Sequence, residues 1–478
     1  MHSGHKPITF LHAILPIAFL AATILYGLIA RPLLLDQEAM SLEFVFILAS
    51  FFSVIELFYL GFSWKEIQSS IVQKISAALP AFFILFAIGT IISSWMICGT
   101  IPMLVYYGLE LVDPRYLYLV SFLIPVIFST LTGTSWGSVG TIGVVLIGIA
   151  TAIEANLGMT AGAIIGGAYF GDKISPLSDT TNLAALAADV DLFSHIRSMI
   201  VTTLPSALLA SMGYLMLGFI YPPTPQVSTL DTLTPFLESL RTMFSFHILL
   251  LIPPGIVLLG SLRKHATIPT LMSSVGSALV LALIFQRFTI ADVSNAISTG
   301  FNNSMAPWAS DLPSQTIALV NRGGLYSMSQ AIFVAFLVFF FIGSMDTINA
   351  MPRVVTRLFA FAKTRSATIL SALAASGLTN ALTSNQYATS FIVGDAFKSR
   401  FDNLKIPRKV LSRSLEDYGT MIESMLPWTS TAVFMVATLG VPWADYWHWQ
   451  FLSLLNLLIA PGIAILGVGC FYHEIEKA

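Results

Sequence analysis

The residues that could do chemistry gather in one polar run, residues 171–182, inside an otherwise apolar stretch. Pro176 cannot donate a backbone hydrogen bond, so a helix through this run should break there and free carbonyl oxygens beside Asp172 and Asp179. Such oxygens are the ligands that a hard cation such as Na+ prefers. Because two carboxylates in one low-dielectric site cannot both be ionised cheaply, we expect this site to hold either a proton or Na+.

Two further polar runs interrupt apolar stretches. Leu131–Trp136 carries hydroxyls and a glycine, and Leu382–Tyr387 carries hydroxyls and amides. If each run is the tip of a helical hairpin, its helix ends expose N–H groups that suit anions and C=O groups that suit cations. The alternative is that Gly133 allows close packing and the hydroxyls bond to their own helices.

A fourth polar run surrounds Pro427 and contains one acid, Glu423. The predicted ligands of the transported cation are acids, hydroxyls and amides from all four runs: Asp172, Asp179, Thr132, Thr134, Ser135, Ser178, Thr180, Asn182, Thr383, Asn385, Glu423, Thr429 and Ser430. Each also has a structural interpretation, since serine, threonine and asparagine cap helices. Asp172 could instead pair with Lys173 at a membrane boundary, and for Lys173 a counter-ion role and a side chain that extends to the membrane surface stay equally open.

Other titratable residues lie near the ends of apolar runs, where we expect interfacial positions. These residues are Glu154, Asp346, Asp395, Glu416, Asp417, His12, His195, His247 and His448.

The composition excludes a water-soluble globule. Of 478 residues 56% are apolar and 10% charged, and the mean hydropathy is +0.81. The net charge of −2 leaves no basic surface for nucleic acid, and Cys98 and Cys470 lie too far apart for a zinc or disulfide motif. Without a phosphate-binding glycine loop, a nucleophile elbow or an HExxH motif, we expect no ATP-driven pump, no enzyme and no cofactor.

Eight apolar runs are long enough to cross a bilayer, near 8–30, 41–61, 76–98, 192–221, 243–262, 266–286, 326–350 and 448–472. Four more, near 115–153, 159–190, 364–400 and 410–440, are interrupted by the polar runs. Ten of the 23 basic residues cluster at 353–365 and 398–413. The excess of basic residues in cytoplasmic loops places both clusters, and then both termini, in the cytoplasm.

The chain repeats itself with an offset of 251 residues: Thr132 aligns with Thr383 and Pro176 with Pro427 (383 − 132 = 427 − 176 = 251). Asp172 then corresponds to Glu423, and Asp179 to Ser430. Segment 366–397 lies between the two basic clusters and should enter and leave on the cytoplasmic side, whereas 115–153 should open outward, so the repeats should be inverted. Inverted repeats with broken helices place substrate and ion sites near the membrane midplane.

The predicted fold class is therefore an all-α polytopic membrane protein with two inverted structural repeats, each with a re-entrant hairpin and a broken transmembrane helix. Repeat 1 has scaffold helices at 1–70 and a core at 71–221, with a hairpin at about 115–153 and a broken helix at about 159–190. An external linker follows at 222–242. Repeat 2 has scaffold helices at 243–320 and a core at 321–478, with a hairpin at about 364–400, a broken helix at about 410–440 and a C-terminal helix.

The stretch Gly166–Ala184 resembles the signature of the NhaC-type Na+/H+ antiporter family of the ion transporter superfamily, and the tip at 132–137 is similar to that family too. The resemblance extends from about residue 70 to 470. It implies the inverted-repeat fold and cation/proton antiport in a bacterial inner membrane, often as a homodimer. Some members of the family exchange organic acids, such as malate for lactate.

We therefore expect a secondary active transporter that exchanges cytoplasmic Na+ for external H+ by alternating access, with Na+, H+ and the lipid bilayer as partners. The alternative is coupled exchange of small organic acids or amines. No arginine lies in the four polar runs, which disfavours an organic anion. A gated ion channel is a rival from another class, and the near-symmetric broken repeats argue against it.

Overall fold

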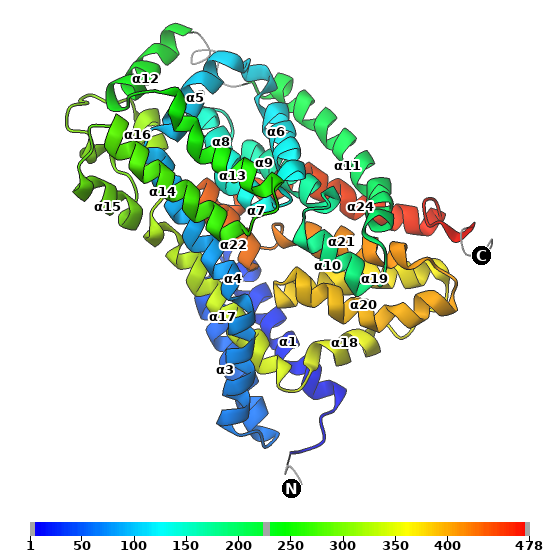
Figure 1. The fold of residues 1–478 in the computed structure, drawn as a ribbon. Coiled ribbons are helices and arrows are strands. Elements are labelled where there is room, and N and C mark those ends of the chain that lie inside the picture. The colour runs from blue at the N-terminus through cyan, green and yellow to red at the C-terminus, as the bar shows by residue number, and fades with distance from the viewer. Residues whose placement is uncertain (1–4, 223–229, 474–478) are drawn as a thin grey trace.

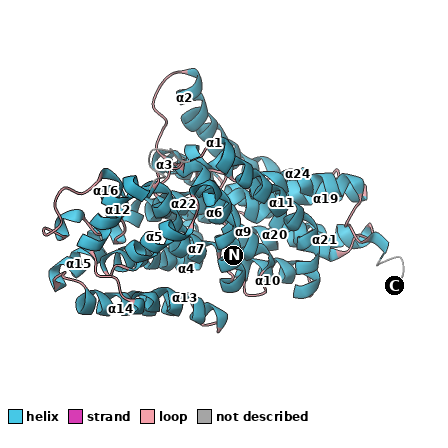
Figure 2. Ribbon diagram, turned by 90° about the horizontal axis from the view of Figure 1, so that it is seen from above, coloured by secondary structure: helices cyan, strands magenta, loops and turns pink. Residues whose placement is uncertain are grey.

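The computed structural model describes residues 5–222 and 230–473, and within them every regular element is a helix (Figures 1 and 2). Eight helices are long and apolar enough to cross a membrane, or up to ten if each of two bent pairs is one span. The predicted all-α polytopic class is confirmed.

Six of the eight candidate spans coincide with predicted apolar runs, and the other two, Pro114–Thr132 and Ser135–Ala152, are the arms of the predicted first hairpin. The eight candidate spans are α1 with η1 (Phe10–Ala30), α3 (Leu42–Tyr59), α4 (Trp64–Ile97), η2 with α6 (Pro114–Thr132), α7 to α8 (Ser135–Ala152), α11 (Leu192–Ile220), α14 (Thr267–Phe285) and η6 with α17 (Leu325–Asp346). The bent pairs are Leu233–Met243 with Ile248–Leu262, at 96°, and Trp443–Trp449 with Phe451–Leu466, at 49°. Shorter helices connect them: α2 (Arg31–Leu34), α5 (Thr100–Leu111), α12 (Leu230–Met243), α15 (Ile290–Thr299), α16 (Ser314–Val320) and α18 (Ala350–Leu358).

Two helical hairpins form where they were predicted. The first consists of α6 (Leu117–Thr132), α7 (Ser135–Ser138), η3 (Val139–Gly143) and α8 (Val144–Ala152), and the second of α19 (Arg365–Thr383) and α20 (Gln386–Asn403). Each tip turns through a residue in the left-handed region, Gly133 at φ +70° and Ser384 at φ +49°. The next residue, Thr134 or Asn385, then caps the following helix with its side chain.

Two broken helices also form where they were predicted. The first is α9 (Leu157–Ile174) with α10 (Asp179–Ala187), and the second is α21 (Arg408–Glu423) with α22 (Ser430–Leu439). Ser178 and Thr429 cap the helices that begin after the breaks, because their hydroxyls accept hydrogen bonds from the N–H groups of Thr181 (3.3 Å) and Ala432 (3.1 Å), respectively.

The offset of 251 residues recurs in the positions where helices begin. Ser135, Leu157, Asp179 and Leu192 begin α7, α9, α10 and α11, and the residues 251 positions later begin α20, α21, α22 and α23 (Trp443–Tyr446). The local signals that start helices are therefore repeated in the two halves.

The two hairpins open at opposite ends of α11. Near the C-terminal end of α11, Phe219 contacts the ring of Tyr116 at the start of the first hairpin, with ring centroids 6.0 Å apart. Just before its start, Asp189 accepts hydrogen bonds from Lys398 (3.2 Å), in the second hairpin, and from Arg408 (2.8 Å). Figure 1 shows the first hairpin in cyan in the upper half and the second in yellow and orange at the lower right. This arrangement agrees with inverted repeats, which stay a prediction.

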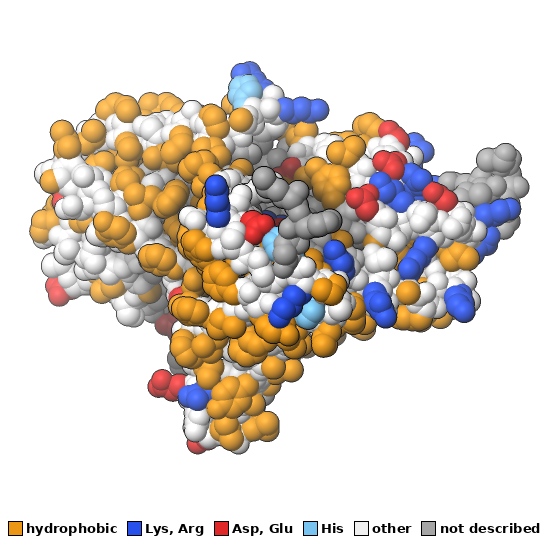
Figure 3. Space-filling view, turned by 90° about the horizontal axis from the view of Figure 1, so that it is seen from below, with side chains coloured by type: hydrophobic (Ala, Val, Ile, Leu, Met, Phe, Trp, Pro, Cys, Tyr) orange, Lys and Arg blue, Asp and Glu red, His pale blue; other side chains and the backbone are white. Residues whose placement is uncertain are grey.

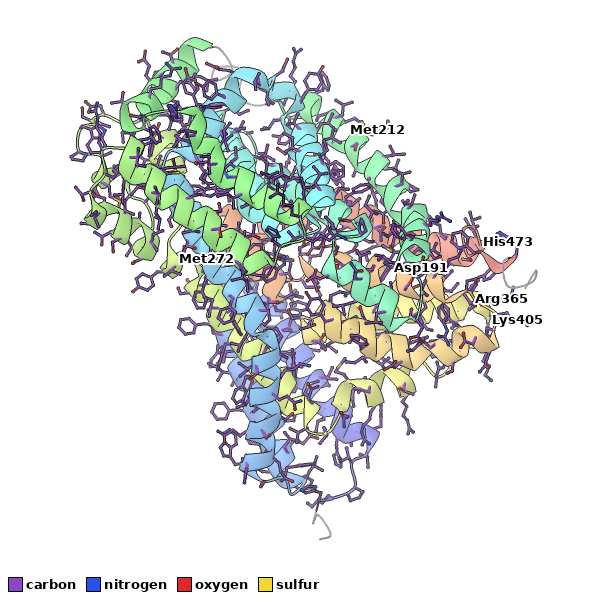
Figure 4. The ribbon with its side chains drawn as sticks, in the orientation of Figure 1. Asp191, Met212, Met272, Arg365, Lys405 and His473 are labelled. Atoms are coloured by element: carbon purple, nitrogen blue, oxygen red, sulfur yellow. The ribbon has the colours of Figure 1, made fainter. Side chains whose placement is uncertain are left out.

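The surface has a charged edge. Figure 4 places Asp191, Arg365, Lys405 and His473 on the same side of the molecule, where α11 begins and the second hairpin opens. On the face shown in Figure 3, Lys and Arg side chains gather toward this side, while hydrophobic side chains are widespread over the rest of that face.

Ion pairs order this edge. Arg408 forms hydrogen bonds with both oxygens of Asp402, at 2.9 and 2.7 Å, and so lowers the pKa of that carboxyl.

Close helix packing depends on small residues in α9. A Cβ at Gly167 or Gly171 of α9 would collide with the backbone of α6. Absent side chains thus let the first broken helix lie directly against the first hairpin.

Three interfacial predictions are wrong. Glu416, Asp417 and His195 are at most 1% exposed. Their helices, α21 and α11, pack against each other and against the core, so polar residues near the ends of apolar runs are covered by protein. Arg413 of the second basic cluster is also buried, at 2% exposed. Residues 223–229 of the predicted linker lie outside the described residues, as do residues 1–4 and 474–478 of the termini.

Candidate ion-binding site

One cavity of about 400 Å³ brings the two hairpin tips and the two helix breaks together. Its walls include Thr134, Ser135, Trp136, Asp172, Asp179, Thr180, Ser384, Asn385, Gln386, Tyr387, Thr420, Glu423, Ser430 and Thr431. The remaining walls come from α4, α17 and the start of α14. None of these lining residues is Lys, Arg or His, so three carboxylates face a cavity without a basic side chain.

Asp172 is the buried carboxylate of the cavity, at 4% exposed. It lies near the end of α9, where the break leaves room for hydroxyls on both sides. Ser135 of the first tip donates to its Oδ2 (2.6 Å), and Ser178 donates to its Oδ1 (2.7 Å). Each oxygen therefore has one neutral donor and lone pairs to spare, which suits either a proton or a cation.

Asp179 begins α10 and is exposed. The hydroxyl of Tyr387, from the tip of the second hairpin, donates to its Oδ2. This hydrogen bond joins residues 208 positions apart and links the second tip to the first broken helix.

Glu423 ends α21 and is 9% exposed. Its Oε1 accepts from the amide of Asn380 (2.8 Å) and its Oε2 from the hydroxyl of Thr431 (3.0 Å). Glu423 occupies in the second half the position of Asp172 in the first, and it too is held by neutral donors.

The predicted ligands divide into two groups. Those that line the cavity are Asp172, Asp179, Thr134, Ser135, Thr180, Asn385, Glu423 and Ser430. Those that do not line it are Thr132, Ser178, Asn182, Thr383 and Thr429. Thr132, for example, donates to the carbonyl of Phe128 in its own helix (2.9 Å), and the amide of Asn182 donates to the carbonyl of Ser178 (2.6 Å). Whether any of them binds the ion stays a prediction.

Sequence reasoning missed two aromatic residues of the cavity. Trp136 stacks on Phe434 of α22, with ring centroids 4.3 Å apart and planes 6° from parallel. Tyr387 lies 251 positions after Trp136 in the second half of the chain, and its hydroxyl contacts the first half by donating to Asp179. The repeat was the available signal, because both residues stand at the same position in the two tips.

The open question about Lys173 has an answer in the fold. Its ammonium lies 2.8 Å from Oδ1 of Asp417, and both side chains are at most 1% exposed. Lys173 is therefore a counter-ion that joins α9 to α21. It pairs with Asp417, not with Asp172.

The cavity extends to the turn between α13 (Ile252–Leu262) and α14. Ala266 of this turn and Pro269 of α14 line the cavity together with Ala77 and Ala81 of α4. The turn is exposed and carries Arg263 and Lys264.

A bound cation would draw on a mixed set of oxygens. Across residues 5–222 and 230–473, no three His, Cys, Asp or Glu side chains are placed to hold a metal ion together. Hydroxyl, amide and carbonyl oxygens would therefore complete the shell around one carboxylate, as hard cations accept.

Comparison with known proteins gives consistent matches. The model of the Na+/H+ antiporter family matches residues 167–468. The Na+/H+ antiporter NhaC of Alkalihalophilus pseudofirmus is 33% identical over 86% of this chain and 87% of its own length. A malate-2H+/Na+-lactate antiporter of Bacillus subtilis is 32% identical over 85% and 84%. The arginine/ornithine antiporter ArcD of Halobacterium salinarum is 31% identical over 98% and 94%.

Proposed function

The chain belongs to the Na+/H+ antiporter family and exchanges Na+ for H+, and we propose that Asp172 is the carboxylate that binds the two ions by turns. The observation that supports this role is the environment of Asp172: a buried carboxylate in the cavity, held by two hydroxyls and paired with no basic side chain. Such a group must gain a positive charge to be stable at low dielectric, and either H+ or Na+ supplies it.

Na+ enters from the cytoplasm in this proposal. The exposed turn that contributes Ala266 to the cavity wall carries Arg263 and Lys264, and an excess of basic residues is typical of cytoplasmic loops. The exposed Asp179 attracts the cation first, and Asp172 binds it deeper with the hydroxyls of Ser135 and Ser178.

In this proposal, movement of the two halves relative to each other provides alternating access. When the cavity opens to the other side, an external proton displaces Na+ from Asp172. A rocking motion of inverted repeats around a central site would supply this change. Both termini in the cytoplasm, a bacterial inner membrane and a homodimer belong to the same proposal.

The test uses everted membrane vesicles with an acidic interior. Added NaCl should dissipate the pH gradient in the parent protein, and Asp172→Asn should abolish this response because the amide carries no negative charge and takes up no proton. Asp402→Asn, on the charged edge, is the matched control and should transport normally. An Asp172→Asn protein that still exchanges at the parent rate would contradict the proposal.

An organic cation is the second candidate substrate. Three carboxylates and no basic side chain line the cavity, so among organic substrates an amine or guanidine fits its charge better than malate or lactate. One relative of similar identity is an arginine/ornithine antiporter. Counterflow of labelled arginine or ornithine in vesicles without Na+ would establish this activity, and its absence would leave Na+ as the cargo.

A further inference from the structure

Two adjacent acids of α21, Glu416 and Asp417, are both buried, at 0% and 1% exposed. Neither lines the cavity. They differ in whether neighbouring cations compensate their charge.

Asp417 is fully compensated. Lys173 and the hydroxyl of Thr202 both donate to its Oδ1, at 2.8 and 2.9 Å, and Asn456 adds a third donor at 3.1 Å. The guanidinium of Arg413 lies 3.9 Å from Oδ2. Asp417 is thus paired with two cations, and its ion pair with Lys173 joins the two halves.

Glu416 has no ion pair. The hydroxyl of Thr420, one turn along α21, donates to its Oε2 at 2.5 Å. Its Oε1 is buried without a hydrogen-bond partner. The charged or titratable groups around it are Lys173 and Asp172 of α9, Glu423 on its own helix, and His195 of α11, which bonds to Ser412 one turn before Glu416.

Neither protonation state of Glu416 is fully satisfied. The ionised carboxylate is buried with one hydrogen bond and no cation of its own. The acid protonated at Oε2 can donate to Oγ1 of Thr420, but its Oε1 still lacks a donor. Since both states carry a cost, a proton can come and go at Glu416, unlike at a group held in one state.

Thr420 connects Glu416 to the cavity, because it lines the cavity and bonds to Glu416. A hydronium in the cavity can give a proton to Oγ1 of Thr420 while the original hydroxyl proton passes to Oε2 of Glu416. The hydronium becomes water, the hydroxyl is restored, and one proton is bound outside the cavity. The reverse steps release it.

We propose that Glu416 is a second proton-binding site, loaded through Thr420, so that two protons move against each Na+. This inference rests on the proposed function, in which Asp172 carries the first proton. One net charge then crosses the membrane in each cycle, and the membrane potential drives Na+ export.

The test measures the coupling ratio in proteoliposomes with a potential set by K+ and valinomycin. With one net charge per cycle, about 59 mV shifts the equilibrium Na+ gradient about tenfold. We expect this shift for the parent and its loss in Glu416→Gln, whose amide keeps an acceptor for Thr420 but takes up no proton. Glu56→Gln is the matched control: Glu56 of α3 is also buried with unpartnered oxygens, but it lies outside the cavity and should keep the shift.

Exchange of labelled Na+ for unlabelled Na+ separates this role from a structural one. It needs no proton, so Glu416→Gln should retain it, and Thr420→Val should slow Na+/H+ exchange without changing the ratio. An unchanged ratio in Glu416→Gln, or loss of Na+/Na+ exchange along with Na+/H+ exchange, would overturn the proposal. Failure of the proposed function has another signature, normal transport in Asp172→Asn.

Discussion

At the scale of single residues, the site depends on carboxylates held by neutral donors. Asp172 accepts one hydroxyl on each oxygen, and Glu423 accepts an amide and a hydroxyl. A guanidinium in these positions would hold the acids permanently ionised and leave no advantage for a second cation. Hydroxyls stabilise the charge just enough for a proton or Na+ to compete for it.

Removing one of these hydroxyls should weaken Na+ binding. In Ser135→Ala or Ser178→Ala, the ionised form of Asp172 loses one hydrogen bond, worth about 1.5–3 kcal/mol for a charged acceptor, so the KM for Na+ should rise at least about tenfold. Sodium titrations of vesicle exchange at fixed pH measure this. A KM that stays at the parent value in both variants would show that these hydroxyls do not support the binding group.

The phenol of Tyr387 should compete with the cation at Asp179. It donates to Oδ2 of that carboxylate, so Na+ must displace or share this hydrogen bond. Tyr387→Phe removes the competitor and should lower the KM for Na+ by up to about tenfold, as expected for one hydrogen bond to a charged group. Tyr326→Phe, an exposed tyrosine outside the cavity, is the control. A higher KM in Tyr387→Phe would mean that the phenol helps to bind the ion.

At the scale of elements, each hairpin tip depends on one residue in the left-handed region. Gly133 fits this conformation without cost, whereas Ser384 at the equivalent position is strained. A Cβ at Gly133 would also lie 2.6 Å from the backbone carbon of Leu177, so the first tip packs directly on the first break.

The two tips should respond to substitution in opposite ways. Gly133→Ala adds both backbone strain and a collision, and should lower the melting temperature and activity. Ser384→Gly relieves strain of about 1 kcal/mol and should leave the melting temperature unchanged or raised, although it also removes the hydrogen bond to the N–H of Ser430. Thermal unfolding in detergent distinguishes the two. Equal loss of stability in both variants would refute the conformational argument.

Breaking the buried ion pair between α9 and α21 should also lower the stability of the fold, and by more than the backbone strain at a hairpin tip. Lys173→Met leaves Asp417 with less compensation, and a broken buried pair costs about 3–5 kcal/mol. Lys173→Met combined with Asp417→Leu removes both charges and should unfold at a higher temperature than Lys173→Met alone. If the double variant is the less stable, the pair contributes more than charge compensation.

At the scale of the whole molecule, the proposed function requires a cavity that is open to the cytoplasm and closed to the exterior. The stack of Trp136, which lines the cavity, on Phe434 joins the first tip to α22 across the two halves. We take this stack as the closure that keeps the cavity from opening to both sides at once.

Removing the stack should expose the cavity to the exterior. In a background with both native cysteines, Cys98 and Cys470, replaced, Thr431→Cys should react with an impermeant thiol reagent from the cytoplasmic side. Adding Trp136→Ala should make the same position reactive from outside and uncouple transport into a leak. Labelling from outside that is the same with and without Trp136→Ala would contradict this closure.

The sequence by itself determined the spans, the four interruptions and the offset of 251 residues. These features depend on local chemistry: apolar runs of bilayer length, Pro176 and Pro427 at the breaks, and capping side chains such as Ser178. Because each signal acts within a few residues, it could be recognised without knowing what packs against it.

Only the tertiary structure decided which of those polar residues share a cavity and which pairs meet. Lys173 contacts Asp417 across 244 positions, and Tyr387 contacts Asp179 across 208. Glu416 and Asp417 looked interfacial because their burial comes from neighbouring helices and not from their own segment. Contacts between distant segments depend on how helices pack, and no local pattern encodes that partner.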